Sequence, residues 1–148
     1  MSHVVKIKTV KLKLSNKNGD ELGYVKNNGT GSKSTMQIVT NEKEASVFEV
    51  MTYDKHTKTI EDPCYYKLKD HSKYYLDMHL SPRDLTRQLL FADKPNLTVS
   101  ASTVAAWTLN NYLQTRVGGF YLGKINDQPN LVAVQSQSSA LKVSAIYV

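Results

Sequence analysis

The sequence predicts an all-β domain built from three copies of a four-stranded unit. Short runs rich in valine, leucine and tyrosine alternate apolar with polar residues, as half-buried strands do. No window shows helical periodicity long enough for a stable helix, and Ser, Thr and Asn are frequent. The same order of strands and turns recurs about every 50 residues, which is typical of an internal repeat.

The first copy starts with strict alternation in Val10–Leu14, followed by a polar turn in which Gly19 can adopt positive φ. A flexible loop is expected at Asn27–Ser32. The four expected strands are Val10–Leu14, Glu21–Val25, Met36–Thr40 and Ser46–Met51.

The other two copies follow the same pattern. The second has expected strands at Tyr65–Lys69, Tyr74–Met78, Leu97–Ala101 and Val104–Leu109. The third has them at Tyr112–Val117, Phe120–Lys124, Leu131–Gln135 and Ala140–Ile146. In the second copy, the segment Ser81–Leu90 lies between the expected strands Tyr74–Met78 and Leu97–Ala101. It is predicted to form a single turn or short 3₁₀ segment, with Ser81 as cap and Pro82 at its first position.

The repeat boundaries are expected near residues 1–54, 55–109 and 110–148. In each copy the second strand contains a comparable pair, Leu22-Gly23, Leu76-Asp77 or Leu122-Gly123. A four-stranded unit cannot cover its own apolar face, whereas three units around a pseudo-threefold axis can share one core and close a barrel. We therefore expect one domain of twelve strands with pseudo-threefold symmetry.

This arrangement resembles the β-trefoil superfamily over essentially the whole chain. The superfamily includes ricin-B-type and fungal lectins, Kunitz-type and mycocypin protease inhibitors, fascin-like actin bundlers and cytokines, so the resemblance alone does not select a function. The Gln-x-Trp motif of ricin-type repeats is absent, because Trp107 follows Ala105-Ala106. The chain is most similar to the cysteine-poor, leaderless lectins and inhibitors of the superfamily.

Length and composition exclude several classes of protein. The 148 residues suit one domain, and no apolar run approaches the roughly 18 residues of a membrane span. The single Cys64 excludes an intramolecular disulfide. Because the first residues alternate lysine with valine, we expect a soluble protein synthesised in the cytoplasm without a signal peptide, with release by a non-classical route left open.

The sequence predicts no catalytic centre, cofactor or metal. It lacks the nucleophile elbow, the zincin motif, the P-loop and the dinucleotide fingerprint. Cys64 is expected to be a small buried residue. His71 and His79 flank one hairpin, but no third residue has the spacing of a metal ligand.

The polar and aromatic residues instead favour sugar binding. A sugar ring stacks on an aromatic face, while amides and carboxylates bind its hydroxyls. The turn chemistry of a β-protein also places such residues at these positions. The expected carbohydrate site, in the second and third copies, comprises Asp70, His71, Tyr75, Asp77, His79, Arg83, Asn126, Asp127 and Asn130.

The leading hypothesis is therefore a lectin of defence or storage type whose partners are glycans or glycoproteins. The alternatives are a protease inhibitor acting through Asn27–Ser34 or Ser81–Gln88, and a fascin-like or cytokine-like interaction module. Nucleic acid is not an expected partner, because the formal charge of +6 comes mostly from lysines. We interpret Lys6, Lys8, Lys11 and Lys13 as one face of a protected strand edge. A homodimer is left open.

Overall fold

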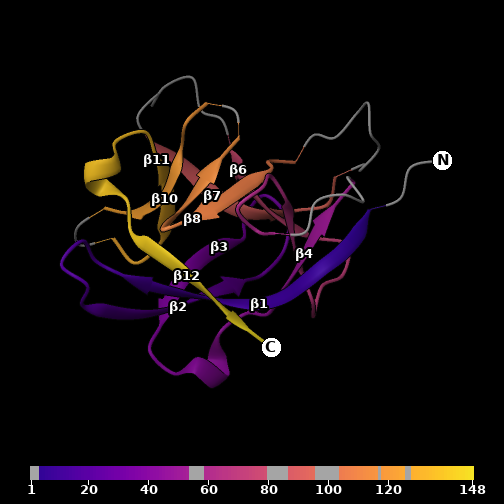
Figure 1. The fold of residues 1–148 in the computed structure, drawn as a ribbon, viewed down its shortest axis with the longest axis horizontal. Coiled ribbons are helices and arrows are strands. Elements are labelled where there is room, and N and C mark those ends of the chain that lie inside the picture. The colour runs from indigo at the N-terminus through magenta and orange to yellow at the C-terminus, as the bar shows by residue number, and fades with distance from the viewer. Residues whose placement is uncertain (1–3, 54–58, 80–86, 96–103, 117, 126–127) are drawn as a thin grey trace.

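The fold is all-β (Figure 1). A computed structural model describes residues 4–53, 59–79, 87–95, 104–116, 118–125 and 128–148. These residues form twelve strands and two 3₁₀ turns. The strands of the first half are β1 (Val5–Ser15), β2 (Glu21–Asn28), β3 (Thr35–Val39), β4 (Phe48–Thr52), β5 (Tyr65–Leu68) and β6 (Tyr75–His79). Those of the second half are β7 (Arg87–Asp93), β8 (Trp107–Asn110), β9 (Tyr112–Thr115), β10 (Tyr121–Lys124), β11 (Leu131–Val134) and β12 (Lys142–Tyr147).

The strands form one antiparallel sheet. Its hydrogen-bonded order is β3-β2-β1-β4-β5-β6-β7-β11-β10-β9-β8, and β12 pairs with β1 beside this path. Two further contacts link elements that this path leaves apart. Cys64 and Trp107 exchange both backbone hydrogen bonds, at 2.9 and 2.7 Å, and the Val143 N–H donates to the Asn111 carbonyl at 2.8 Å.

The expected strands agree with the observed ones except in the second copy. The structure has a strand that was not predicted there, β7, which begins at Arg87, whereas the predicted strand Leu97–Ala101 lies outside the described residues after Pro95. The predicted turn or 3₁₀ segment is wrong for residues 87–90, which are extended; residues 81–86 are not described. Pairing of β7 with both β6 and β11 decides the conformation here, because it satisfies the backbone on both sides.

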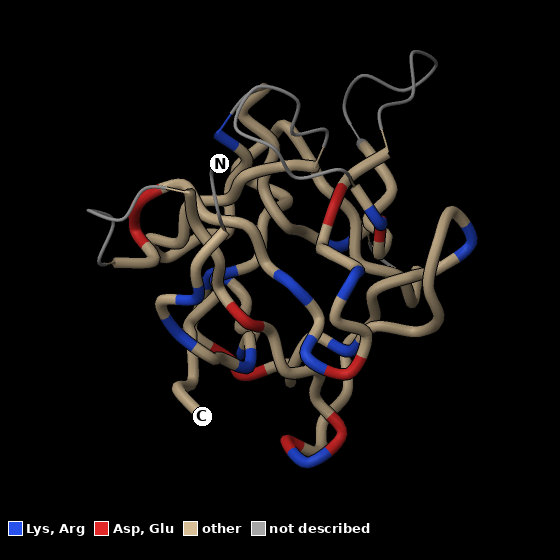
Figure 2. The backbone as a smooth tube through the Cα atoms, turned by 90° about the vertical axis from the view of Figure 1, so that its right-hand side faces the viewer, with Lys and Arg blue, Asp and Glu red and all other residues tan. Residues whose placement is uncertain are grey.

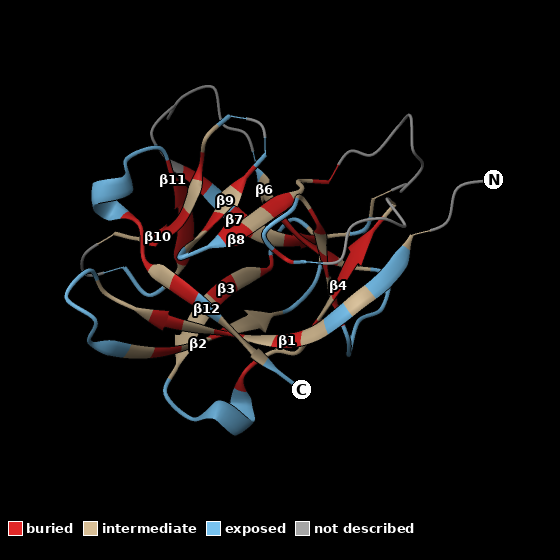
Figure 3. Cartoon of the chain, viewed as in Figure 1, coloured by how far each residue is buried: buried red, intermediate tan, exposed pale blue. Residues whose placement is uncertain are grey.

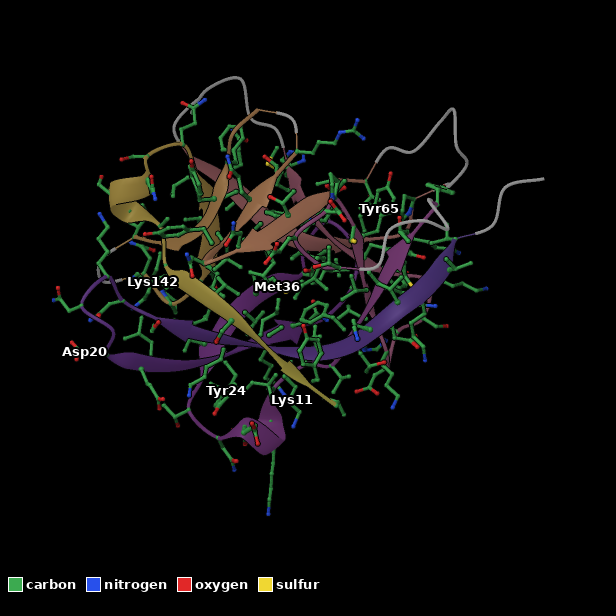
Figure 4. All side chains as sticks on the ribbon, in the orientation of Figure 1. Lys11, Asp20, Tyr24, Met36, Tyr65 and Lys142 are labelled. Carbon is green, nitrogen blue, oxygen red and sulfur yellow. The ribbon has the colours of Figure 1, made fainter. Side chains whose placement is uncertain are left out.

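The core is one apolar cluster to which strands from all parts of the chain contribute (Figure 3). Its largest fully buried side chains are Trp107, Tyr66 and Phe48, and the rings of the last two meet edge to face. The Trp107 indole N–H donates to the Leu76 carbonyl at 3.2 Å, so the polar atom of this ring is satisfied. Met36 lies inside the molecule, whereas Asp20 projects from its periphery (Figure 4).

The same 3₁₀ turn occurs twice. One comprises Glu42–Glu44 before β4, and the other comprises Gln137–Ser139 before β12. Each is capped by a polar side chain, from Asn41 or Ser136, that accepts the N–H two residues on. Each ends at a buried alanine, Ala45 or Ala140. The two segments therefore have the same local design although they are far apart in the sequence.

The glycines after Leu22 and Leu122 are required by close backbone approach. A methyl group at Gly123 would lie 2.6 Å from the Ser139 carbonyl oxygen, and one at Gly23 would overlap the Val39 carbonyl. Asp77 is the residue expected to correspond to these two glycines. Its carboxylate oxygen accepts the N–H of Ala105 at 3.0 Å.

Candidate functional site

Three hairpins, β2–β3, β6–β7 and β10–β11, meet through strands that are distant in the sequence. β7 pairs with β11, Gly31 forms a bridge with Ala92 near the end of β7, and Gln37 of β3 forms a bridge with Asn130. These contacts hold the three hairpins in fixed relative positions. The hairpin junction is the name we use for this region.

The buried Ser34 hydroxyl holds the junction together. It donates to the Gly31 carbonyl at 2.6 Å and accepts the Ala92 N–H at 2.7 Å, while the Gly31 N–H donates to the Ala92 carbonyl at 2.8 Å. The segment that joins β2 to β3 is therefore tied to β7. This limits Asn27–Ser34 as an inhibitor loop, because Asn27 and Asn28 belong to β2 and Ser34 is buried.

A cavity of about 380 Å³ opens at the hairpin junction, within the ~300–1,000 Å³ range of small-molecule sites. Segments from all three hairpins contribute to its wall. We call it the hairpin cavity, and it is lined by Ser32, Lys33, Ser34, Thr35, His79, Leu89, Leu90, Phe91, Asn130 and Leu131.

Two rings form one wall of the hairpin cavity. His79 at the end of β6 and Phe91 of β7 meet edge to face, with centroids 6.0 Å apart and planes at 86°. Leu89, which is opposite His79 in the β6–β7 register, is 59% exposed although its neighbours Gln88 and Leu90 are buried. The cavity therefore offers partly exposed aromatic and aliphatic surface.

A chain of three amide side chains ends at the hairpin cavity, and its last member, Asn130, lines it. The Asn28 Nδ2 donates to Gln37 Oε1 at 2.6 Å, and the Gln37 Nε2 donates to Asn130 Oδ1 at 3.0 Å. This amide relay crosses from β2 and β3 to the start of β11. Asn130 uses one acceptor site of its oxygen in the relay, which leaves both Nδ2 hydrogens as donors for a ligand.

The structure brings His79 and Asn130 together at the hairpin cavity, out of the nine residues expected to bind sugar. Asp70 and His71 lie exposed in the turn between β5 and β6 and do not line this cavity. Arg83, Asn126 and Asp127 lie outside the described residues.

Tyr75 and Asp77 share one face of β6 with His79, as strand alternation requires, but their exposure differs. Tyr75 is buried in a small cluster with Met51 and Val104, and Asp77 is 6% exposed, whereas His79 is exposed. The Asp77 carboxylate accepts the N–H groups of Met78 at 2.8 Å and Ala105 at 3.0 Å. Asp77 thus interacts with the backbone of the protein, and the nearby Asp93 side chain also contributes to the raised pKa of its carboxyl.

Phe91, Lys33, Thr35 and Leu89 line the cavity but were absent from the sequence-based site. For the two β7 residues a signal existed, because Gln88-Leu89-Leu90-Phe91-Ala92 is a strand-like apolar run. The capping pattern at Ser81-Pro82 instead led to the prediction of a turn that included residues 87–90. Lys33 and Thr35 have no comparable signal, since only tertiary contacts bring their segment to β7.

A second cavity, of about 660 Å³, lies where the β1–β2 turn, the end of β10 and the second 3₁₀ turn meet. Its described lining contains no aromatic ring and is Asn16, Lys17, Asn18, Leu22, Lys124, Ile125, Ser138, Ser139, Ala140 and Leu141. It therefore lacks the stacking surface that the hairpin cavity offers.

The lysines of β1 have partners inside the fold. Lys6 and Lys67 both pair with Glu49, at 3.3 and 3.4 Å, and Lys13 pairs with Glu21. Lys11 donates to the Glu42 carbonyl at 3.1 Å, and the Lys8 ammonium lies 5.4 Å from the ring centroid of Tyr147. The strand is not a sheet edge as expected, because β1 pairs with β2, β4 and β12.

Basic and acidic residues are interspersed along the chain (Figure 2). Within the described part of the chain, no three His, Cys, Asp or Glu side chains gather in a way that could hold a metal ion, and no helix is long and apolar enough to cross a membrane. Cys64 is buried, and burial raises the pKa of its thiol to about 11.

No model of a protein family matches the sequence, and no curated protein matches it.

Replacing Ser34 with alanine should lower the free energy of unfolding by about 1–3 kcal/mol, because the buried Ala92 N–H loses its acceptor. Urea denaturation measures the change. Ser32→Ala is the matched control, since Ser32 is exposed in the same segment. Equal stability of the two variants would contradict the role given to the Ser34 hydroxyl.

Burial raises the pKa of Asp77 from an ordinary 3.8 to about 6, although the Met78 and Ala105 N–H groups oppose this shift. A pKa raised in the folded state means that stability is greatest with Asp77 protonated and is lost as the pH rises from about 4 through 6. Relative to Asp77→Asn, the free energy of unfolding of the wild type should fall by roughly 2–3 kcal/mol between pH 4 and pH 7. Urea denaturation of both proteins across this pH range measures the difference. If the free energies of unfolding of the two proteins changed with pH in parallel, the role given to Asp77 would be contradicted.

Proposed function

We propose that this chain is a carbohydrate-binding protein of β-trefoil type, acting without a cofactor or catalytic step, and that its sugar site is the hairpin cavity. The observation that carries the proposal is the cavity itself. It combines the Phe91 and His79 rings with the Asn130 amide and with the Ser32 and Thr35 hydroxyls. An apolar ring face beside convergent hydrogen-bonding groups is the surface that a pyranose requires.

The trefoil arrangement is supported by the grouping of the strands. The hairpins β2–β3, β6–β7 and β10–β11 meet at the junction, one from each expected copy. The other six strands follow one another through β1–β4, β4–β5, β8–β9 and β12–β1 ladders, with the Cys64–Trp107 bridge and the Val143–Asn111 hydrogen bond between them. The two 3₁₀ turns with matching caps agree with a repeated unit.

The junction also supports binding by a preformed site. The Ser34 hydroxyl and the amide relay fix the cavity walls through buried or partly buried hydrogen bonds. A ligand then need not order these groups, which reduces the entropic cost of binding. Weak monosaccharide binding at one such site is the expected behaviour of a lectin.

The test is a glycan array with the wild-type protein, followed by titration of the best-bound sugar into two variants. His79→Ala should weaken binding about fivefold to tenfold, since it removes one ring of the cavity wall, a loss of roughly 1 kcal/mol. His71→Ala is the matched control, because His71 is an exposed histidine away from the cavity. A silent array with a folded protein, or equal losses in both variants, would contradict the proposal.

A further inference from the structure

We infer that the hairpin cavity selects acidic sugars, meaning pyranosides that carry a carboxylate or sulfate group, over their neutral counterparts. This inference rests on the proposed function and names the substrate class of the same site. It follows from which polar atoms of the lining are free and from the charges that the lining carries.

The free side-chain groups of the cavity are mainly hydrogen-bond donors. Asn130 gives its oxygen to Gln37, so its Nδ2 group faces no partner among the described residues. Ser34 both donates and accepts inside the fold, so it has no role toward a ligand. Lys33 is exposed and forms no ion pair with a described residue. The groups that remain for a ligand are the Lys33 ammonium, the Asn130 NH₂ group and the His79 ring, together with the hydroxyls of Ser32 and Thr35.

The lining contains no carboxylate. Its charged and titratable side chains are Lys33 and His79, and it has no Asp or Glu among the described residues. A neutral sugar offers hydroxyl protons that need acceptors, and an aspartate or glutamate would be the strongest acceptor for them. A carboxylate or sulfate offers only acceptors, which match a lysine and an amide NH₂, and such charge-assisted hydrogen bonds are about twice as strong as neutral ones.

The amide relay fixes this donor character. Asn28 donates to the Gln37 oxygen, which obliges the Gln37 nitrogen to donate to Asn130 and turns the Asn130 NH₂ away from it. Gln37 does not line the cavity, so it is a positioning residue that acts through Asn130. Gln37→Glu replaces the donor with an acceptor. Asn130 would then donate to the carboxylate introduced at position 37 and present its own oxygen to the ligand.

The test compares methyl β-D-glucuronide with methyl β-D-glucoside, which differ in a carboxylate against a hydroxymethyl group. Amide NMR titration should show the glucuronide binding about tenfold more tightly to the wild type. Lys33→Gln should abolish most of this preference, because it weakens glucuronide binding far more than glucoside binding. Lys73→Gln is the matched control, an exposed lysine in the β5–β6 turn, and should keep the preference. Gln37→Glu should reduce the preference without loss of the glucoside, an effect that a merely structural role would not produce.

The outcomes separate the inference from the proposed function. Equal affinity for both glycosides, or a preference untouched by Lys33→Gln, would overturn the inference and leave sugar binding standing. Absence of binding by both glycosides, together with a silent array, would overturn the proposed function. Displacement of the glucuronide by an equal concentration of acetate would show a simple anion site and would overturn the inference.

Discussion

The Ser34 hydroxyl is the interaction on which the candidate site depends. It is a buried group with two partners, the Gly31 carbonyl and the Ala92 N–H, and so joins the β2–β3 segment to β7. Without an acceptor for the Ala92 N–H, the strand would bury an unpaired donor. With it, Lys33 and Thr35 are held across from His79 and Phe91. One buried hydroxyl thereby connects two parts of the cavity lining that are far apart in the sequence.

The rest of the fold provides a rigid support for this junction. Trp107, Tyr66 and Phe48 fill the shared core, and the capped 3₁₀ turns lead the chain into β4 and β12. Within this support, Asp77 buries a carboxyl whose raised pKa makes stability depend on pH. On the same face of β6, His79 of the candidate site therefore lies two positions from the buried Asp77.

Alternation predicted most strands, because each half-buried strand carries its own signal. It did not predict β7, where a capping pattern competed with a strand whose stability comes from pairing on both sides with β6 and β11. The same contrast, between signals carried within one strand and contacts between distant strands, explains why the sequence predicted only part of the candidate site. His79 and Asn130 were identified by chemistry alone, but their meeting depends on the Gln37–Asn130 bridge, a contact across 93 residues. Burial of Tyr75 and Asp77 depends equally on residues 104–105, which alternation within β6 cannot reveal.

The junction of three hairpins is proposed to form a preformed ligand cavity, and a crystal structure of the protein soaked with methyl β-D-glucuronide would show whether it does. We expect a pyranose beside Phe91, with its carboxylate within hydrogen-bond distance of the Lys33 ammonium and the Asn130 Nδ2, and no movement of Ser34 or Ala92. A sugar bound only in the second cavity near Lys17 and Lys124, or a junction that rearranges to admit the ligand, would contradict it.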